Sequence, residues 1–386
     1  MKRLIPAAIP LIILFISCEN DTLEHKPANP ADTLSSNPAE PPKVAVDTLY
    51  AVCVVADFPN SKLEDMNSGM NSVDKVWEVL NSISHHWVNM SQDRQALKWK
   101  QIRVTVSEDL SMKSFNNSWY DYRQDVLKQA LLQLETSEYD IDNDNSIDVM
   151  FIIASNNNLE PDYLIGGAAE VFVNSIGAQT FVDQQSGLSL EVRATGNFSH
   201  EIGHNLGLPD IYGPKDNVQY LTIMSDSWAI PPHIFSAYEK DKLGWAEPQL
   251  IIETTPDIEL KPGERSLDFL KIPTVDTLEY FLVEYRKRQP DSYTSEAVID
   301  YDGIVIYNVK NYIENGEVLL ELLSVVPADG KDYFNSLLQQ TAFWYPANAF
   351  MPEYCSLKTS DGKACGILLT DFKFTDSSMS VNVVYE

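Results

Sequence analysis

Residues 200–210, which read His-Glu-Ile-Gly-His-Asn-Leu-Gly-Leu-Pro-Asp, constrain the fold more than any other part of the chain. On an α-helix, residues four positions apart lie on one face, so His200 and His204 stand one turn apart. Gly207 tolerates the left-handed backbone that ends a helix, and Pro209 prevents the helix from resuming. The segment therefore predicts a helix that stops near residue 207 and a chain that turns back towards the two imidazoles.

These side chains have the spacing of a zinc site. Two imidazoles one turn apart can each reach one Zn²⁺ at about 2.0 Å, and Asp210 can supply the third ligand while water takes the fourth position. Glu201 points beside the metal, where a carboxylate can take a proton from a zinc-bound water. We predict His200, His204 and Asp210 as zinc ligands and Glu201 as the general base. Glu239, on a later predicted helix, is the alternative third ligand.

The run from His200 to Gly213 resembles the zinc signature of the immune inhibitor A family of secreted bacterial metallopeptidases, a metzincin-like group. Residues 223–225, Ile-Met-Ser, are similar to the tight turn that places a Met beneath the zinc ligands in that family. Residues 232–238 and 242–245 are similar to the helix that closes its catalytic domain. The resemblance implies the same ligands and base as the spacing, with Met224 as structural support.

The resemblance also implies an activity. We expect a zinc-dependent endopeptidase that hydrolyses peptide bonds of extracellular or periplasmic polypeptides through a zinc-bound water and Glu201 as general base. The alternative is a catalytically silent zinc-binding surface lipoprotein whose β-rich C-terminal half binds a glycan or a host protein. A structural zinc site has no use for a base beside an open coordination position, so Glu201 favours the peptidase.

The N-terminus predicts export. Lys2 and Arg3 precede an apolar stretch, residues 4–16, that is too short to anchor a helix across a bilayer. The following Cys18 resembles the lipidated residue of a bacterial lipoprotein, although a plain secretory signal with a stray Cys is the alternative. We therefore predict a lipoprotein-type signal peptide over residues 1–18 and attachment through Cys18 to the outer membrane, on its cell-surface or periplasmic face.

Composition restricts the partners. The chain has 386 residues, with 28 basic and 56 acidic side chains and a formal charge of -28. Such a charge repels nucleic acid, so we expect no nucleic-acid partner. We expect a monomer that acts on a polypeptide substrate.

The distribution of apolar and turn-forming residues along the chain predicts an α+β fold in two parts. Residues 19–47 are rich in Pro, Asn and Thr without an apolar period and indicate a flexible tether. Over residues 48–246, apolar strands alternate with amphipathic helices, which indicates a metzincin-like catalytic domain with a mixed sheet and the active-site helix. Over residues 247–386, short β-branched runs separated by Pro, Gly and Asp indicate a β-rich C-terminal domain.

An acidic turn is a candidate site for a second metal ion. The carboxylates of Asp140, Asp142, Asp144 and Asp148 crowd one short segment, and oxygen ligands at alternating positions suit Ca²⁺. The Gly and the terminal Glu of an EF-hand loop are missing, so a solvated acidic turn is the equal alternative. We therefore predict Ca²⁺ only as one of two interpretations of this turn.

Three cysteines remain once Cys18 is set aside. Cys53 lies in an apolar run where a buried free thiol is the usual state. Cys355 and Cys365 flank a predicted turn, and export permits oxidation, so we predict a disulfide between them.

Overall fold

The computed structural model describes residues 48–59, 62–65, 72–105, 125–140, 147–154, 162–165, 172–177, 190–211, 218, 221–227, 229, 231–263, 266–287, 303–326 and 354–386. These residues belong to one compact unit that spans residues 40–386. The predicted signal peptide and tether lie outside the described residues, and the predicted boundary near residue 246 stays a prediction. No helix in the described part of the chain is long and apolar enough to cross a membrane.

The first sheet is mixed, as the alternation of strands and helices predicts. Its five strands run in the order β2-β1-β3-β5-β4, and β4 is antiparallel to β5 while the other neighbours are parallel. The strands are β1 (Thr48–Asp57), β2 (Ala96–Thr105), β3 (Val149–Ala154), β4 (Asp162–Ile165) and β5 (Phe172–Gly177). Buried apolar runs form β1 and β3, because a strand covered on both faces needs no polar alternation.

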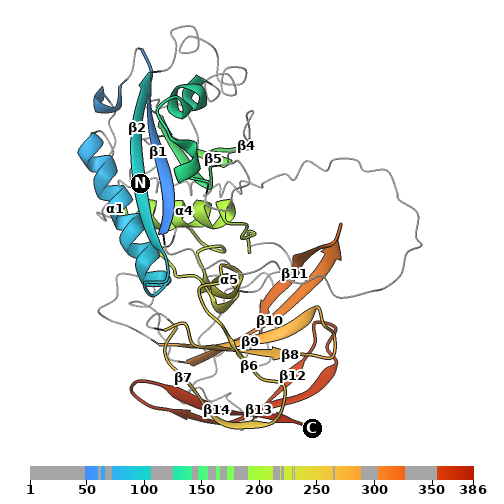
Figure 1. Cartoon of the computed structure of the whole chain (residues 1–386). Coiled ribbons are helices and arrows are strands. Elements are labelled where there is room, and N and C mark those ends of the chain that lie inside the picture. The colour runs from blue at the N-terminus through green and yellow to red at the C-terminus, as the bar shows by residue number, and fades with distance from the viewer. Residues whose placement is uncertain are drawn as a thin grey trace, which may run out of the picture. The chain divides into compact units, whose positions relative to one another are not determined.

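Helices cover both faces of this sheet (Figure 1). Alternate residues of a strand point to opposite faces, and β1 shows this directly. Cys53 shares a core with α1 (Val73–Met90) and α4 (Leu190–Asn205), whereas Val54 shares a core with the helical residues 125–131. The helix α4, which carries the His-Glu-Ile-Gly-His segment, is thus held against the sheet together with α1.

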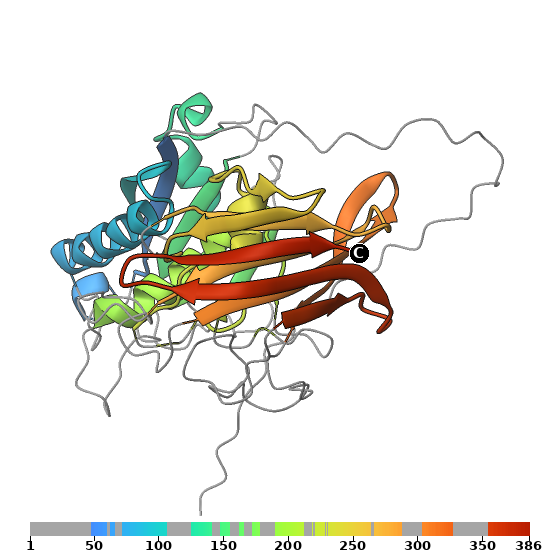
Figure 2. The same ribbon diagram turned by 90° about the horizontal axis from the view of Figure 1, so that it is seen from below.

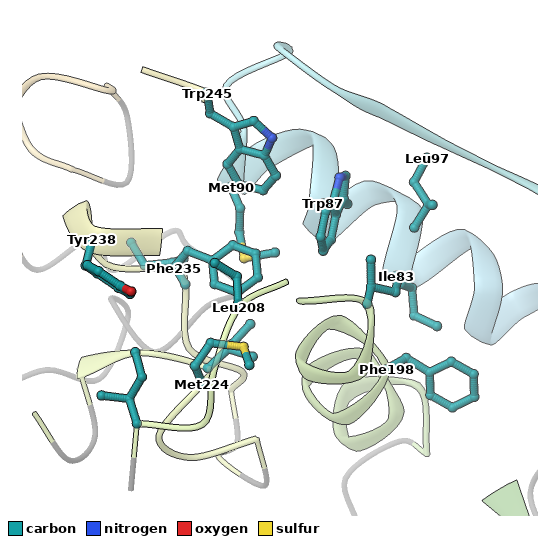
Figure 3. Close-up of a cluster of buried hydrophobic side chains, with 14 of the residues drawn as sticks. Ile83, Trp87, Met90, Leu97, Phe198, Leu208, Met224, Phe235, Tyr238 and Trp245 are labelled. Carbon is teal, nitrogen blue, oxygen red and sulfur yellow. The ribbon is translucent and has the colours of Figure 1, made fainter. Parts of the chain in front are cut away.

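An aromatic cluster joins α1 to the chain on either side of α5 (Ala237–Lys242). The Trp87 ring meets Phe235 and Trp245 edge to face at centroid distances of 5.7 and 5.2 Å (Figure 3). Its indole N–H donates to Gln95 Oε1 at 2.9 Å, so the buried polar atom keeps a partner. This packing fixes α5 relative to the helices beside the first sheet.

After residue 246 the regular elements of the described residues are strands in two sheets (Figure 2). One sheet has the order β11-β10-β9-β8-β6 and the other β12-β13-β14-β7. The first contains β6 (Gln249–Leu250), β8 (Phe269–Pro273), β9 (Glu279–Arg286), β10 (Gly303–Glu314) and β11 (Glu317–Val325). The second contains β7 (Thr255–Leu260), β12 (Tyr354–Lys358), β13 (Ala364–Phe374) and β14 (Met379–Tyr385).

The strand β9 is buried along its whole length and serves two cores. Phe281 and Val283 pack with the apolar residues of the four-stranded sheet. Tyr280 and Leu282 pack on the opposite side, in the core that contains α1, α4 and α5. Even-numbered residues of β9 therefore face the helical part of the unit, and the two-residue period extends that face to Glu284 and Arg286.

The cysteine prediction requires a correction. Cys53 is a buried free thiol, as predicted, and burial raises its pKa to about 12. Cys355 and Cys365 are also free thiols, so the predicted disulfide is absent. The strand register explains this, because Cys355 pairs with Leu369, four residues along β13 from Cys365. Cysteines can be bridged only when their Cα atoms lie within about 7 Å.

Glycine in α4 allows a close approach that alanine would prevent. A side chain on Gly196 would begin 2.6 Å from the backbone oxygen of Ser227, whereas one on Gly203 would meet a side-chain atom, the Sδ of Met224, at 2.7 Å. Alanine gains about 1 kcal/mol of helix propensity, but overpacking against a backbone atom costs about 1–3 kcal/mol. We expect Gly196→Ala to lower the free energy of unfolding, and Gly203→Ala to lower it less, by urea denaturation. A more stable Gly196→Ala protein would contradict this packing.

A buried histidine predicts acid sensitivity. Burial lowers the pKa of His86 from 6.5 to about 3, so the folded protein keeps this ring neutral while the unfolded chain protonates it below pH 6.5. Its stabilising contribution is complete above pH 6.5 and is lost as the pH falls towards 3, at up to about 1.4 kcal/mol per pH unit. His86→Gln should flatten the dependence of the unfolding free energy on pH between 6.5 and 5. Equal slopes in wild type and variant would refute the assignment.

Candidate metal centre

The helix α4 ends where the sequence predicts, and its end shapes the site. Gly207 has a φ of +85°, which is the left-handed region that favours glycine. The Leu208 N–H donates to Gly203 O at 2.9 Å and the Gly207 N–H to His204 O at 2.9 Å. This pair of bonds is the Schellman arrangement, which satisfies carbonyls at a helix end and turns the chain back. The turn directs Leu208 and Asp210 towards the histidines.

Two backbone carbonyls orient the imidazoles. His204 Nδ1 lies 2.8 Å from Leu208 O, and His200 Nδ1 lies 3.0 Å from Ile223 O. A carbonyl oxygen can only accept, so each Nδ1 must donate its hydrogen. In the neutral ring this leaves the Nε2 lone pair free to bind a metal, and a partner at Nδ1 is the usual support of a ligating histidine.

The ligand atoms of three side chains converge. His200 Nε2 and His204 Nε2 are 3.0 Å apart, and Asp210 Oδ1 lies 3.2 and 3.1 Å from them. The His200 side chain is 5% exposed, and those of His204 and Asp210 are 19% and 23% exposed. The cluster is therefore held from within the protein and open on one side.

This triangle fits a zinc ion. Zinc bonds of about 2.0–2.1 Å in tetrahedral geometry separate neighbouring ligand atoms by about 3.3–3.4 Å. The observed separations of 3.0–3.2 Å need only a small expansion to reach that value. Two nitrogens and one carboxylate oxygen are also a donor set that zinc uses at catalytic sites, where the fourth position stays open.

Charge at the cluster favours a cation. Burial raises the pKa of Asp210. The hydrogen bonds with His200 and His204 lower it by a larger amount, so the net pKa is well below the usual range of an aspartate. Burial lowers the pKa of His204, but the hydrogen bond and charge of Asp210 raise it, and the net pKa is above its ordinary value. The carboxylate is thus kept ionised between the rings, where positive charge is stabilised.

Glu201 lies on α4 beside the two predicted histidine ligands. One of its carboxylate oxygens lies within 4.8 Å of a ring nitrogen of both His200 and His204. Its carboxylate is thus near the same two imidazoles that Asp210 reaches from beyond the helix end. Glu201 is 5% exposed, so its carboxylate acts in a largely desolvated position.

Glu239, the alternative third ligand, has other partners. One carboxylate oxygen accepts the Thr222 hydroxyl at 2.5 Å, and the other accepts the backbone N–H and the hydroxyl of Ser236, which caps α5. Burial raises the pKa of Glu239, while these hydrogen bonds oppose the change. The carboxylate of Glu239 is committed to the start of α5, whereas that of Asp210 reaches both imidazoles.

Met224 packs against α4, and its support of the zinc ligands stays a prediction. Its side chain is fully buried, and its sulfur packs where Gly203 of α4 has no side chain (Figure 3). Its backbone oxygen accepts the Ile211 N–H at 3.0 Å, next to Asp210. We call residues 221–224 the support segment. This segment therefore contacts both α4, which carries His200 and His204, and the stretch of chain after α4 that carries Asp210.

Sequence reasoning missed the groups that orient the site. The carbonyls of Leu208 and Ile223 have no side-chain signature, since any residue supplies the same backbone oxygen. A signal did exist for the packing of α4. Gly196 and Gly203 are seven residues apart and so share one helix face, which indicates a close neighbour on that side.

The other predicted site residues have different outcomes. Asp140 and Asp148 are described, and the Asp148 N–H donates to Tyr139 O at 2.9 Å, but Asp142 and Asp144 lie outside the described residues. The calcium site stays a prediction. Cys18 also lies outside the described residues, and its lipidation stays a prediction.

No family model matches the chain, and no curated protein matches it. Solved structures with some similarity include the archaemetzincin of Methanopyrus kandleri, at 15% identity and a TM-score of 0.28 over 51% of this chain and 94% of that one. They also include a chaperone–substrate complex, at 14% identity and a TM-score of 0.30 over 52% of this chain and only 33% of that one. Neither superposition is close enough to define the fold or the site of this chain.

The helix end yields a test of the metal centre. Alanine at Gly207 meets no atom within 4 Å, so its cost is the left-handed backbone alone, about 1–2 kcal/mol of stability. We expect Gly207→Ala also to weaken zinc binding by about 10-fold, because it displaces Leu208 O from His204. A chelator-competition titration with Zn²⁺ measures this effect.

Gly362 provides the matched control. It has a φ of +82° and equally open surroundings, but it lies in the turn between β12 and β13. Gly362→Ala should lose similar stability and keep wild-type zinc affinity. Equal zinc affinities of the two variants would disprove the role of the helix end.

Proposed function

We propose that this chain is a zinc-dependent endopeptidase that hydrolyses peptide bonds of polypeptides. The observation that carries the proposal is the triangle of His200 Nε2, His204 Nε2 and Asp210 Oδ1, with Glu201 beside it. Three protein donors leave one coordination position for water or substrate, and a neighbouring carboxylate has a use only when a proton must move. This combination supports a peptidase over a site whose zinc is only structural.

The residues divide the reaction between them. His200, His204 and Asp210 would hold the zinc ion, which would supply Lewis acidity to the peptide carbonyl and to the attacking water. Glu201 accepts a proton from the attacking water and then delivers it to the leaving amine, so the carboxylate ends the cycle as it began. The carbonyls of Leu208 and Ile223 hold the Nδ1 hydrogens and keep both imidazoles in the tautomer that binds metal.

We further propose the family and the location that the sequence predicts. The motif from His200 to Gly213 and the buried Met224 support membership of an immune inhibitor A-like, metzincin-like group. Residues 1–18 support export and anchoring through Cys18 to the bacterial outer membrane. The substrate is then an extracellular or periplasmic polypeptide, and the strong negative charge of the chain opposes a nucleic-acid partner.

The decisive test compares wild type with Glu201→Gln, both as residues 19–386 and at matched zinc content. Glutamine keeps the size of the side chain but cannot accept a proton. We expect the rate of hydrolysis of denatured casein to fall by about 10²–10⁴-fold, with one zinc bound per chain in both proteins. A wild type that binds zinc and cleaves none of several unfolded proteins would favour the silent zinc-binding alternative.

A further inference from the structure

We propose that Arg286 of β9 is a positioning residue of the metal centre, through the backbone of the support segment. The inference rests on the proposed zinc site. Arg286 Nη1 donates to Leu221 O at 3.2 Å, and Leu221 begins the support segment. The same segment supplies Ile223 O to His200 and Met224 O to Ile211, next to Asp210.

Arg286 is placed for this contact by the strand that carries it. Leu282, Glu284 and Arg286 are alternate residues of β9 and share the face turned to the helical part. The side chains of Glu284 and Arg286 are each 1% exposed, and Arg286 Nη1 also donates to Glu284 Oε1 at 3.0 Å. Tyr307 of the neighbouring β10 donates its hydroxyl to the same oxygen at 2.6 Å.

The surrounding backbone is adapted to this ion pair. A side chain on Gly263 would begin 3.1 Å from Glu284 Oε2 and 3.7 Å from Lys240 Nζ, so glycine leaves room for both charged groups. Lys240 of α5 donates to Gly263 O at 2.7 Å, and Gly263 N–H donates to Tyr285 O at 2.7 Å. The pair is thus part of a buried polar layer that links β9 to α5.

A buried ion pair adds little net stability, because desolvation of both charges offsets their attraction, and apolar replacements are often as stable. Its geometric consequence is more specific. Arg286 brings a charged donor to the carbonyl at one end of the support segment, while Thr222 in that segment binds Glu239 of α5. Two anchors from outside α4 therefore hold the backbone that orients His200.

The test uses the double variant Glu284→Gln/Arg286→Met, which removes the donor to Leu221 O and both charges of the ion pair together, while Lys240 keeps its hydrogen bond to Gly263 O. We expect its zinc affinity to fall by about 10-fold, the lower end for a group that orients a ligand. We also expect a changed visible spectrum of the Co²⁺-substituted protein, because that spectrum reports ligand geometry. Faster hydrogen exchange at the Ile211 and Ile223 amides provides a readout without metal.

Two variants separate positioning from general stability. Tyr307→Phe removes a hydrogen bond to Glu284 and leaves the Arg286 contact with Leu221 O in place. Val381→Ala opens the core of the four-stranded sheet, away from the support segment. Both should lose stability while keeping wild-type zinc affinity and Co²⁺ spectrum.

The outcomes distinguish this inference from the proposed function. Weakened zinc binding in the double variant alone supports the positioning role, whether or not wild type cleaves casein. Unchanged affinity and amide exchange in the double variant overturn it, even if the enzyme is an active peptidase. If wild type binds no zinc, the proposed function fails, and unchanged exchange at Ile211 and Ile223 would then also overturn the positioning role.

Discussion

The candidate site depends on two backbone carbonyls that hold imidazole hydrogens. Leu208 O fixes His204 at 2.8 Å, and Ile223 O fixes His200 at 3.0 Å. Without these acceptors the rings could rotate or exchange tautomers, and their Nε2 atoms would not converge with Asp210 Oδ1. A different structural feature fixes the position of each carbonyl. The helix end at Gly207 places Leu208, whereas the support segment, residues 221–224, places Ile223.

The support segment connects the site to the remainder of the unit. Met224 packs against the glycine face of α4, and Thr222 binds the carboxylate of Glu239 at the start of α5. Arg286 reaches Leu221 from β9, a strand whose other face belongs to the core of the four-stranded sheet. The β-rich part is therefore linked directly to the site, because Arg286 on a buried face of β9 contacts the segment that orients the predicted ligand His200.

Much of the architecture could be predicted from local patterns. The predicted alternation of apolar strands and amphipathic helices over residues 48–246 is found in β1, α1, the helical residues 125–131 and β3. The prediction of a disulfide between Cys355 and Cys365 was wrong. Nearness in sequence does not decide which residues of two antiparallel strands lie opposite each other. The acidic turn at Asp140 stays open, as does the domain boundary near residue 246.

The sequence by itself determined that two imidazoles stand one turn apart on a helix that ends shortly after them. The four-residue spacing of His200 and His204 and the stop at Gly207 are local properties of a helix, whose geometry is the same in any fold. Only the tertiary structure decided that Asp210 and not Glu239 reaches the imidazoles, that Ile223 O orients His200, and that Arg286 contacts Leu221. Those contacts join residues far apart in the chain through backbone atoms and packed faces. Backbone atoms are the same in every residue, and the packing of distant faces cannot be read from the residue order.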